Sequence, residues 1–210
     1  VEDDANNRGQ LCVTVPATCA GLCEAHARYG KLPLEQVLEP AIHLASQGFE
    51  ADWYLSLFAA NNLEPFGRDP YLSSMWLPDG HPPKSYPAPA EKVVQRDLGE
   101  LLKRIARNGA DAMYRGEVAE AIHEFMSKGD GLLTRQDLAD YRPVVSEPLT
   151  ANFKGYTLNF VPTPSGGITN LETFGILENF DLAALGHNSV PYLHTLIQSA
   201  RHAFADRFRY

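Results

Sequence analysis

Apolar residues recur every three or four positions along most of the chain, which is the period of an amphipathic helix. The pattern is clearest from Val94 to Ile105, and Gly109 ends that run. The same spacing predicts further helices over residues 18–30, 33–48, 53–62, 118–129, 134–141, 168–180 and 191–210. We therefore expect a mostly helical chain, with Thr18, Asp52 and Thr134 as N-terminal caps.

A proline interrupts one of these helical patterns. Proline cannot donate the backbone hydrogen bond of a helix interior, but it is tolerated in the first turn. Residues 33–48 are therefore predicted to form either two short helices, the second beginning at Pro40, or one kinked helix. Gly48 is expected to end it.

Residues 64–90 are rich in proline and have no helical period. This composition predicts an extended, ordered surface excursion rather than a helix. Tyr71 and Trp76 are expected to pack it against the rest of the chain. The segment is not read as a domain boundary, and residues 1–210 are treated as a single partial domain.

Strand-like patterning appears only late in the chain. Residues of high β-propensity lie on both sides of Phe153-Lys154-Gly155, which predicts a hairpin over about 143–161. Helices together with one hairpin place the chain in the α+β class.

Composition limits the classes of function. The chain has 210 residues, is 44% hydrophobic and carries a net charge of −8. It is large enough to bury a core, and its acidity without a basic patch argues against nucleic acid or anionic membranes as partners. No run of 18 apolar residues predicts a membrane span. Because the sequence does not begin with methionine, we expect a processed or truncated product.

Three cysteines, Cys12, Cys19 and Cys23, lie close together near the N-terminus. An odd number is a poor disulfide framework. Cys19 and Cys23 share a helical face with His26, a spacing that can bind metal. Burial as small apolar groups beside Leu22 is the favoured interpretation, with no metal. Free thiols slightly favour a cytoplasmic location over a periplasmic or extracellular one.

One turn is a candidate for binding chemistry. Ser165-Gly166-Gly167 links a predicted strand to a predicted helix, so its backbone N–H groups could face an anion. It is neither a G-x-S-x-G elbow nor a P-loop. The alternative is that the glycines only permit a tight connection.

Two other pairs of polar residues are weaker candidates for a functional site. Asp206-Arg207 could bind a carboxylate or form a structural ion pair. His123-Glu124 lacks the second histidine of a zinc motif. No catalytic residue, metal site or cofactor is assigned from these residues.

Several collinear segments resemble the large subunit of the gamma-glutamyltransferase family of N-terminal-nucleophile hydrolases. They are VTVPATCAGLCEAHARYGKLPLEQVLEPAIHLASQGF, IARNGADAMYRGEVAEAI, GDGLLTRQDLADYRPVVSEPL, YTLNFVPTPSGG, GILENFDLAALG and ARHAFADRFRY. The resemblance spans nearly the whole chain. It implies a four-layer αββα sandwich to which this chain contributes helices and a hairpin.

The resemblance also implies that the active enzyme has two subunits and that the nucleophile lies on the small one. Family members are made as one precursor that cuts itself before a threonine, which then heads the small subunit. That threonine attacks a gamma-glutamyl or related amide, and water or an amine takes the acyl group. We therefore expect the nucleophile, and the arginine that binds the substrate carboxylate, to lie outside these 210 residues. The implied partners are the small subunit and a small amide substrate.

Two departures from the family pattern affect the expected substrate. The V-P-G turn of the family is Val15-Pro16-Ala17, and its S-S-G-G turn is Pro164-Ser165-Gly166-Gly167. Both indicate a divergent member. The alternatives are a cephalosporin acylase-like or oxamate hydrolase-like amidase and, from another class, a non-catalytic helical binding module.

Overall fold

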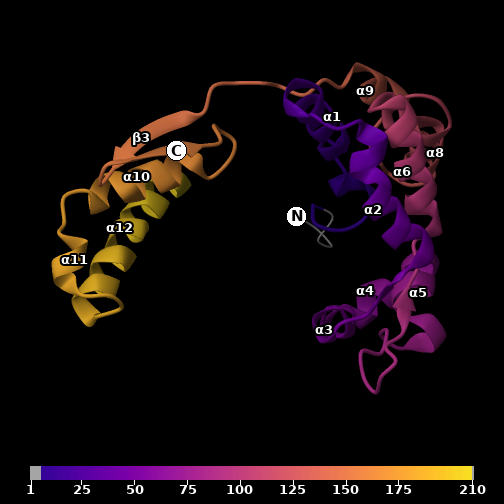
Figure 1. Cartoon of the computed structure of the whole chain (residues 1–210), viewed down its shortest axis with the longest axis horizontal. Coiled ribbons are helices and arrows are strands. Elements are labelled where there is room, and N and C mark those ends of the chain that lie inside the picture. The colour runs from indigo at the N-terminus through magenta and orange to yellow at the C-terminus, as the bar shows by residue number, and fades with distance from the viewer. Residues whose placement is uncertain (1–5, 210) are drawn as a thin grey trace. The chain divides into compact units, whose positions relative to one another are not determined.

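Two compact units make up the chain, the first ending at Pro143 and the second beginning at Val144. The computed structural model describes residues 6–209, and each unit has its own helices and its own small sheet (Figure 1). None of the described helices combines the length and the apolar character that a membrane crossing requires.

The first unit is nearly all helical. Its helices are α1 (Thr18–Tyr29), α2 (Leu34–Gln47), α3 (Trp53–Asn61), α4 (Leu63–Arg68), α5 (Pro70–Trp76), α6 (Arg96–Asn108), α7 (Asp111–Tyr114), α8 (Gly116–Ser127) and α9 (Arg135–Asp140), with 3-10 turns η2 (Gln10–Cys12) and η3 (Pro78–Gly80). A short antiparallel pair, β1 (Phe49–Glu50) and β2 (Lys92–Val93), brings the end of α2 beside the segment that leads into α6.

Two of the three predicted caps are confirmed. Asp52 accepts a hydrogen bond from the backbone N–H of Leu55 at 2.7 Å, and Thr134 forms a complete capping box with Asp137. The third prediction is wrong, because Thr18 is the first residue of α1 and no side chain caps that helix. The backbone is already helical at Ala17, so the cap position falls one residue earlier.

The segment around Pro40 forms one helix rather than two. α2 continues through Pro40 and ends where Gly48 takes a φ of 82° and donates to the backbone oxygen of Leu44 at 2.9 Å. α2 lies against α6 (Figure 1). The contact is close because Gly99 of α6 faces Ser46 of α2, and a Cβ on Gly99 would lie 2.4 Å from the Ser46 hydroxyl oxygen.

A buried cluster joins α1 to the helices that follow α6. Its members are Ala20, Tyr114, Ala119, Met126, Leu133 and Leu138. Tyr114 supplies the polar link, because its hydroxyl donates to the backbone oxygen of Pro16 and accepts from the backbone N–H of Ala20 at 3.1 Å. Its ring stacks on Tyr141 with centroids 5.6 Å apart. The cluster therefore holds the N-terminal segment onto α7, α8 and α9.

All three cysteines are free, partly buried thiols, and Cys19 packs against this cluster. The expectation that Leu22 shares their buried face is wrong, because its side chain is 67% exposed. The buried face of α1 is centred on Ala20, and a residue two positions along a helix points about 200° away. Across residues 6–209, no three His, Cys, Asp or Glu side chains gather where they could hold a metal ion.

The proline-rich stretch is more helical than expected. Residues 63–76 form α4 and α5, so the prediction that residues 64–90 contain no helix is wrong for this part. Pro65 and Pro70 both lie in a first helical turn, where the missing N–H has no partner to lose. Asp69 caps α5 by accepting from the backbone N–H of Leu72 at 2.8 Å.

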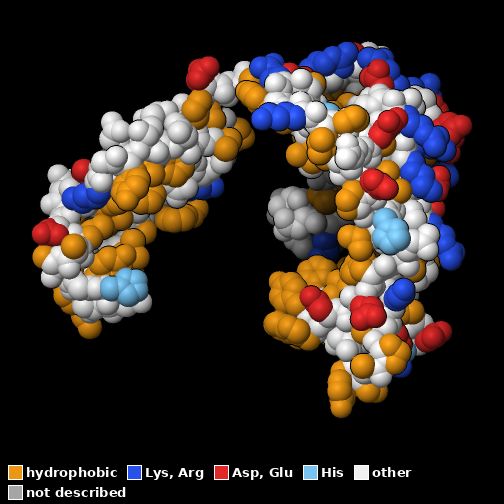
Figure 2. Space-filling view, in the orientation of Figure 1, with side chains coloured by type: hydrophobic (Ala, Val, Ile, Leu, Met, Phe, Trp, Pro, Cys, Tyr) orange, Lys and Arg blue, Asp and Glu red, His pale blue; other side chains and the backbone are white. Residues whose placement is uncertain are grey.

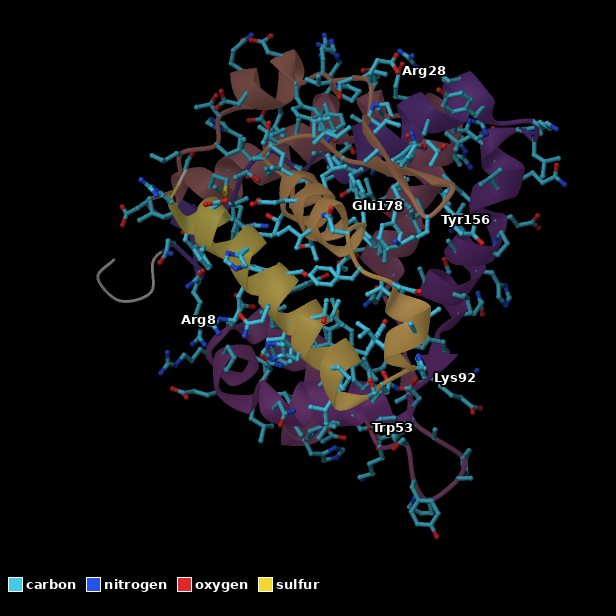
Figure 3. All side chains as sticks on the ribbon, turned by 90° about the vertical axis from the view of Figure 1, so that its left-hand side faces the viewer. Arg8, Arg28, Trp53, Lys92, Tyr156 and Glu178 are labelled. Carbon is cyan, nitrogen blue, oxygen red and sulfur yellow. The ribbon has the colours of Figure 1, made fainter. Side chains whose placement is uncertain are left out.

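An exposed apolar surface covers α3. Trp53, Tyr54, Leu57 and Phe58 all expose about half or more of their side chains. Figure 2 shows apolar side chains gathered over this helix, and Figure 3 labels Trp53. A helix that is apolar on all sides is normally buried.

The second unit is built from a hairpin and three helices. β3 (Leu149–Phe153) pairs antiparallel with β4 (Tyr156–Phe160), so that Ala151 faces Leu158. α10 (Gly167–Leu177) packs on both strands and on α12 (Val190–Arg209), and α11 (Leu182–Leu185) lies against α12. The strands lie inside the range expected for the hairpin, and residues 144–148 form no strand.

The hairpin turn is held by α10. Lys154 and Gly155 have φ values of 48° and 85°, the positive pair that a two-residue turn of this kind needs. The backbone N–H of Lys154 donates to Glu178 at 3.0 Å, and its ammonium group donates to the Glu178 backbone oxygen at 2.8 Å. Figure 3 labels Glu178 at the end of α10. Phe174 then fills the hairpin–helix interface against Phe153 and Phe160.

Candidate functional site

The candidate turn lies where β4 gives way to α10. The backbone N–H of Ser165 donates to the oxygen of Pro162 at 3.1 Å, and the backbone oxygen of Gly166 accepts the first helical bond, from Asn170, at 3.1 Å. No side chain caps α10. The N–H groups of its first turn therefore have no partners within the helix.

The two glycines have different reasons to be glycine. A Cβ on Gly167 would lie 2.1 Å from the backbone oxygen of Val161 and 3.1 Å from the Cβ of Phe160. Only glycine allows β4 and α10 to approach this closely. A Cβ on Gly166 would meet only Nη1 of Arg207, at 3.0 Å. Gly167 therefore serves packing, and Gly166 faces the end of the Arg207 side chain.

Two carboxyl groups, one on α10 and one on α12, lie close together near this turn. Glu172 of α10 is hydrogen-bonded to Asp206 of α12, and this bond raises the pKa of Glu172 above its usual range. Partial burial and the Asp206 charge raise the pKa further, whereas His202 lowers it. The folded structure therefore favours the protonated form of Glu172.

The structure separates Asp206 from Arg207. Asp206 faces Glu172, and Arg207 lies beside Gly166. Neighbouring residues on a helix point in different directions, and the ion pairs found among the described residues do not join these two. The alternative that they form an ion pair with each other is wrong. What remains is a cluster of Gly166, Arg207, Asp206 and Glu172 at one end of the α10–α12 interface.

Sequence reasoning missed Glu172. It lies 34 residues before Asp206, and the contact arises only because α10 and α12 pack together. No spacing rule pairs two acidic residues on separate helices. His202 could have been linked to Asp206, because the two are four residues apart on one helix.

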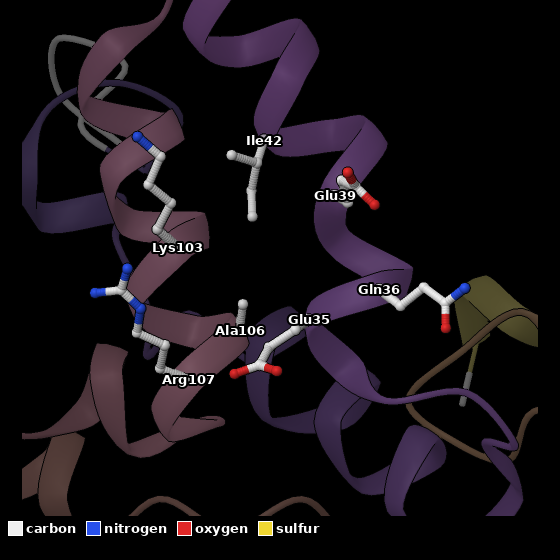
Figure 4. Close-up of a pocket in the computed structure, with 7 residues that line it drawn as sticks. All are labelled: Glu35, Gln36, Glu39, Ile42, Lys103, Ala106 and Arg107. Carbon is white, nitrogen blue, oxygen red and sulfur yellow. The ribbon is translucent and has the colours of Figure 1, made fainter.

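Two of the grooves on the first unit lie along α6. One, of about 380 Å³, lies between α2 and α6 and is bordered by acidic residues of α2 and basic residues of α6 (Figure 4). Its lining is Glu35, Gln36, Glu39, Ile42, Lys103, Ala106 and Arg107. The other, of about 830 Å³, is mostly apolar and runs along α6 and α8. Neither groove brings a nucleophile next to a base, so neither offers covalent chemistry.

Comparison with known proteins decides the family. A sequence model described as gamma-glutamyltranspeptidase matches residues 1–210. The chain belongs to the gamma-glutamyltranspeptidase family. It is 40% identical over 206 residues to the acylase ACY 1 proenzyme of Pseudomonas sp. strain SE83, covering 98% of this chain and 36% of that protein. It is 34% identical over 206 residues to the glutathione hydrolase proenzyme of Escherichia coli K12, covering 95% of this chain and 34% of that protein.

The fold agrees with the family. The crystal structure of Helicobacter pylori gamma-glutamyltranspeptidase superposes with a TM-score of 0.92 at 30% identity, covering all of this chain and 60% of that one. The predicted α+β class, mostly helical with a hairpin, is confirmed, and so is the resemblance read from the motifs. The chain spans about a third of the length of these two relatives, both of which are proenzymes.

Proposed function

We propose that this chain is part of the large subunit of an enzyme that hydrolyses or transfers gamma-glutamyl groups of glutathione-type amides. The observation that carries the proposal is the family match over residues 1–210. In this proposal a small subunit supplies the threonine nucleophile, and this chain supplies walls and scaffold to the shared site. No residue of this chain attacks the substrate.

Within that site, Ser165-Gly166-Gly167 is the proposed point of closest approach to the substrate. Its support is chemical. The uncapped start of α10 offers backbone N–H groups and a partial positive charge. Gly166 has no side chain of its own, and the atom that borders its Cβ position is Nη1 of Arg207. A substrate carboxylate at such an exposed helix start gains about 0.3–1 kcal/mol.

A related amidase is the second candidate. It is favoured by one observation, because the acylase ACY 1 proenzyme is 40% identical to this chain and the Escherichia coli glutathione hydrolase proenzyme is 34% identical. Under this alternative the nucleophile and fold are the same, but the acyl group lacks the amino group of gamma-glutamate. A cephalosporin acylase-like or oxamate hydrolase-like enzyme would fit this description.

The test uses the complete proenzyme that contains this chain. Self-cleavage is followed by gel electrophoresis, and kcat/KM is measured for gamma-glutamyl p-nitroanilide and for glutaryl p-nitroanilide, which lacks only the α-amino group. A higher kcat/KM for the gamma-glutamyl compound supports the first candidate, and the reverse supports the amidase. Absence of both cleavage and turnover supports a non-catalytic module. The 210-residue chain alone is the control and is expected to be inactive.

A further inference from the structure

Two consecutive residues of α12 lie beside different positions along α10. Arg207 approaches the helix start, where its Nη1 lies 3.0 Å from the Cβ position of Gly166. Asp206 lies beside Glu172, further along the same helix, where α10 and α12 pack together. One contact is to the turn and the other is to the helix body, so α12 can hold the turn relative to the rest of α10.

Arg207 lies in the last turn of α12, where a cation is favourable, but it also lies beside the start of α10. A helix start carries a partial positive charge, and a cation beside it is unfavourable. The ion pairs found among the described residues give Arg207 no acidic partner to offset this. Nη1 of the guanidinium lies against the position that a Cβ on residue 166 would take, 3.0 Å away.

We propose that Arg207 is a positioning residue, which packs on Gly166 and holds the backbone of the Ser165-Gly166-Gly167 turn in its substrate-binding conformation. The Asp206–Glu172 contact keeps α12 in register with α10, so that Arg207 reaches the turn. The inference rests on the proposed function, because it assumes that this turn borders the substrate.

The first test measures hydrogen exchange in the turn and does not depend on enzyme activity. Hydrogen–deuterium exchange of residues 162–170 is compared in the complete proenzyme and its Arg207→Ala variant. Loss of the guanidinium is expected to speed exchange in this segment. Arg201→Ala is the matched control, because Arg201 is an exposed arginine of the same helix that contacts Gln198. Equal exchange in the two variants contradicts the proposal.

The second test separates binding from chemistry. With the better of the two anilides, Arg207→Ala is expected to raise KM about two- to five-fold at an unchanged kcat, the size of a lost helix-start contact to a carboxylate. Arg207→Lys should restore little, because an ammonium lacks the planar guanidinium. An unchanged KM overturns the proposal. If neither anilide is turned over by the unmodified protein, the proposed function fails, and the exchange experiment still decides whether Arg207 holds the turn.

A double-mutant cycle tests the contact directly. Gly166→Ala should push the guanidinium away by a few tenths of an ångström and speed exchange of the turn slightly. In the Arg207→Ala background the same substitution meets no neighbour and should add nothing. Additive effects of the two substitutions would show that Gly166 and Arg207 act independently.

Discussion

The Cβ position of Gly167 lies 2.1 Å from the backbone oxygen of Val161. A methyl group there cannot be relieved by rotating a side chain, so β4 and α10 must move apart. Gly167→Ala is expected to lower the free energy of unfolding by about 1–3 kcal/mol, the usual cost of overpacking. Urea unfolding followed by circular dichroism measures this.

Gly175→Ala is the matched control for that substitution. Gly175 lies on the same helix, and a Cβ there would have no neighbour within 4 Å. Alanine costs less conformational entropy than glycine in a helix, so this variant is expected to gain about 0.5–1 kcal/mol. Similar changes in both variants would mean that the Val161 contact does not limit packing.

The α2–α6 contact offers a second test of close packing. A Cβ on Gly99 would lie 2.4 Å from the hydroxyl oxygen of Ser46, which is buried and has no hydrogen-bond partner. Gly99→Ala is expected to destabilise the first unit by about 1–3 kcal/mol. Ser46→Ala removes the obstacle and an unsatisfied hydroxyl, so it should be neutral or stabilising. In that background Gly99→Ala should be tolerated, and thermal unfolding of the four variants tests the coupling.

The sequence predicts the longer helices, because their apolar period is long, but it does not predict the short helices α4, α5, α7 and α11. The prediction from sequence fails where the effect of a residue depends on its position within a helix. Pro65 and Pro70 suggested an extended chain, yet both occupy first turns of helices, where proline is acceptable. The prediction for Leu22 fails because α1 buries the small residue Ala20 rather than the leucine.

Only one part of the candidate site could be predicted from the sequence. The Ser165-Gly166-Gly167 turn could be found, since glycine pairs between a strand and a helix are a local signal. Its neighbours Arg207 and Glu172 could not be linked to it, because tertiary packing of α10 on α12 brings them together. Periodicity predicts which face of a helix is buried, but it does not predict which helix covers that face.

Tyr114 is expected to be a major contributor to the stability of the first unit through its hydroxyl group. The side chain is 5% exposed and bonds both Pro16 and Ala20. Tyr114→Phe leaves those two backbone groups without their partner, which should cost about 1–3 kcal/mol. Tyr29→Phe is the control, because Tyr29 is 78% exposed and should change the unfolding midpoint little.

Cys19 is expected to react slowly with alkylating reagents. Partial burial and the neighbouring Cys23 raise the pKa of its thiol to about 11. Because the thiolate is the reactive form, little of Cys19 is reactive at pH 8. Iodoacetamide labelling followed by peptide mass spectrometry should show a Cys19 rate that climbs as the pH is raised from 8 to 10. A rate at pH 8 that matches an unperturbed cysteine peptide would contradict this.

Glu172 should make the stability of the second unit depend on pH. Its hydrogen bond to Asp206, with burial and the Asp206 charge, raises its pKa above the ordinary 4.5. The folded state therefore binds this proton more tightly than the unfolded state does. The stabilisation is complete below pH 4.5 and is lost as the pH rises through the raised pKa.

Glu172→Gln stays neutral and can still hydrogen-bond Asp206. Its unfolding temperature should therefore exceed that of the unmodified protein at pH 7, and the difference should close near pH 4. Glu147→Gln, at an exposed glutamate of the same unit, is the control. A gap that is the same at both pH values would show that folding does not raise the pKa of Glu172.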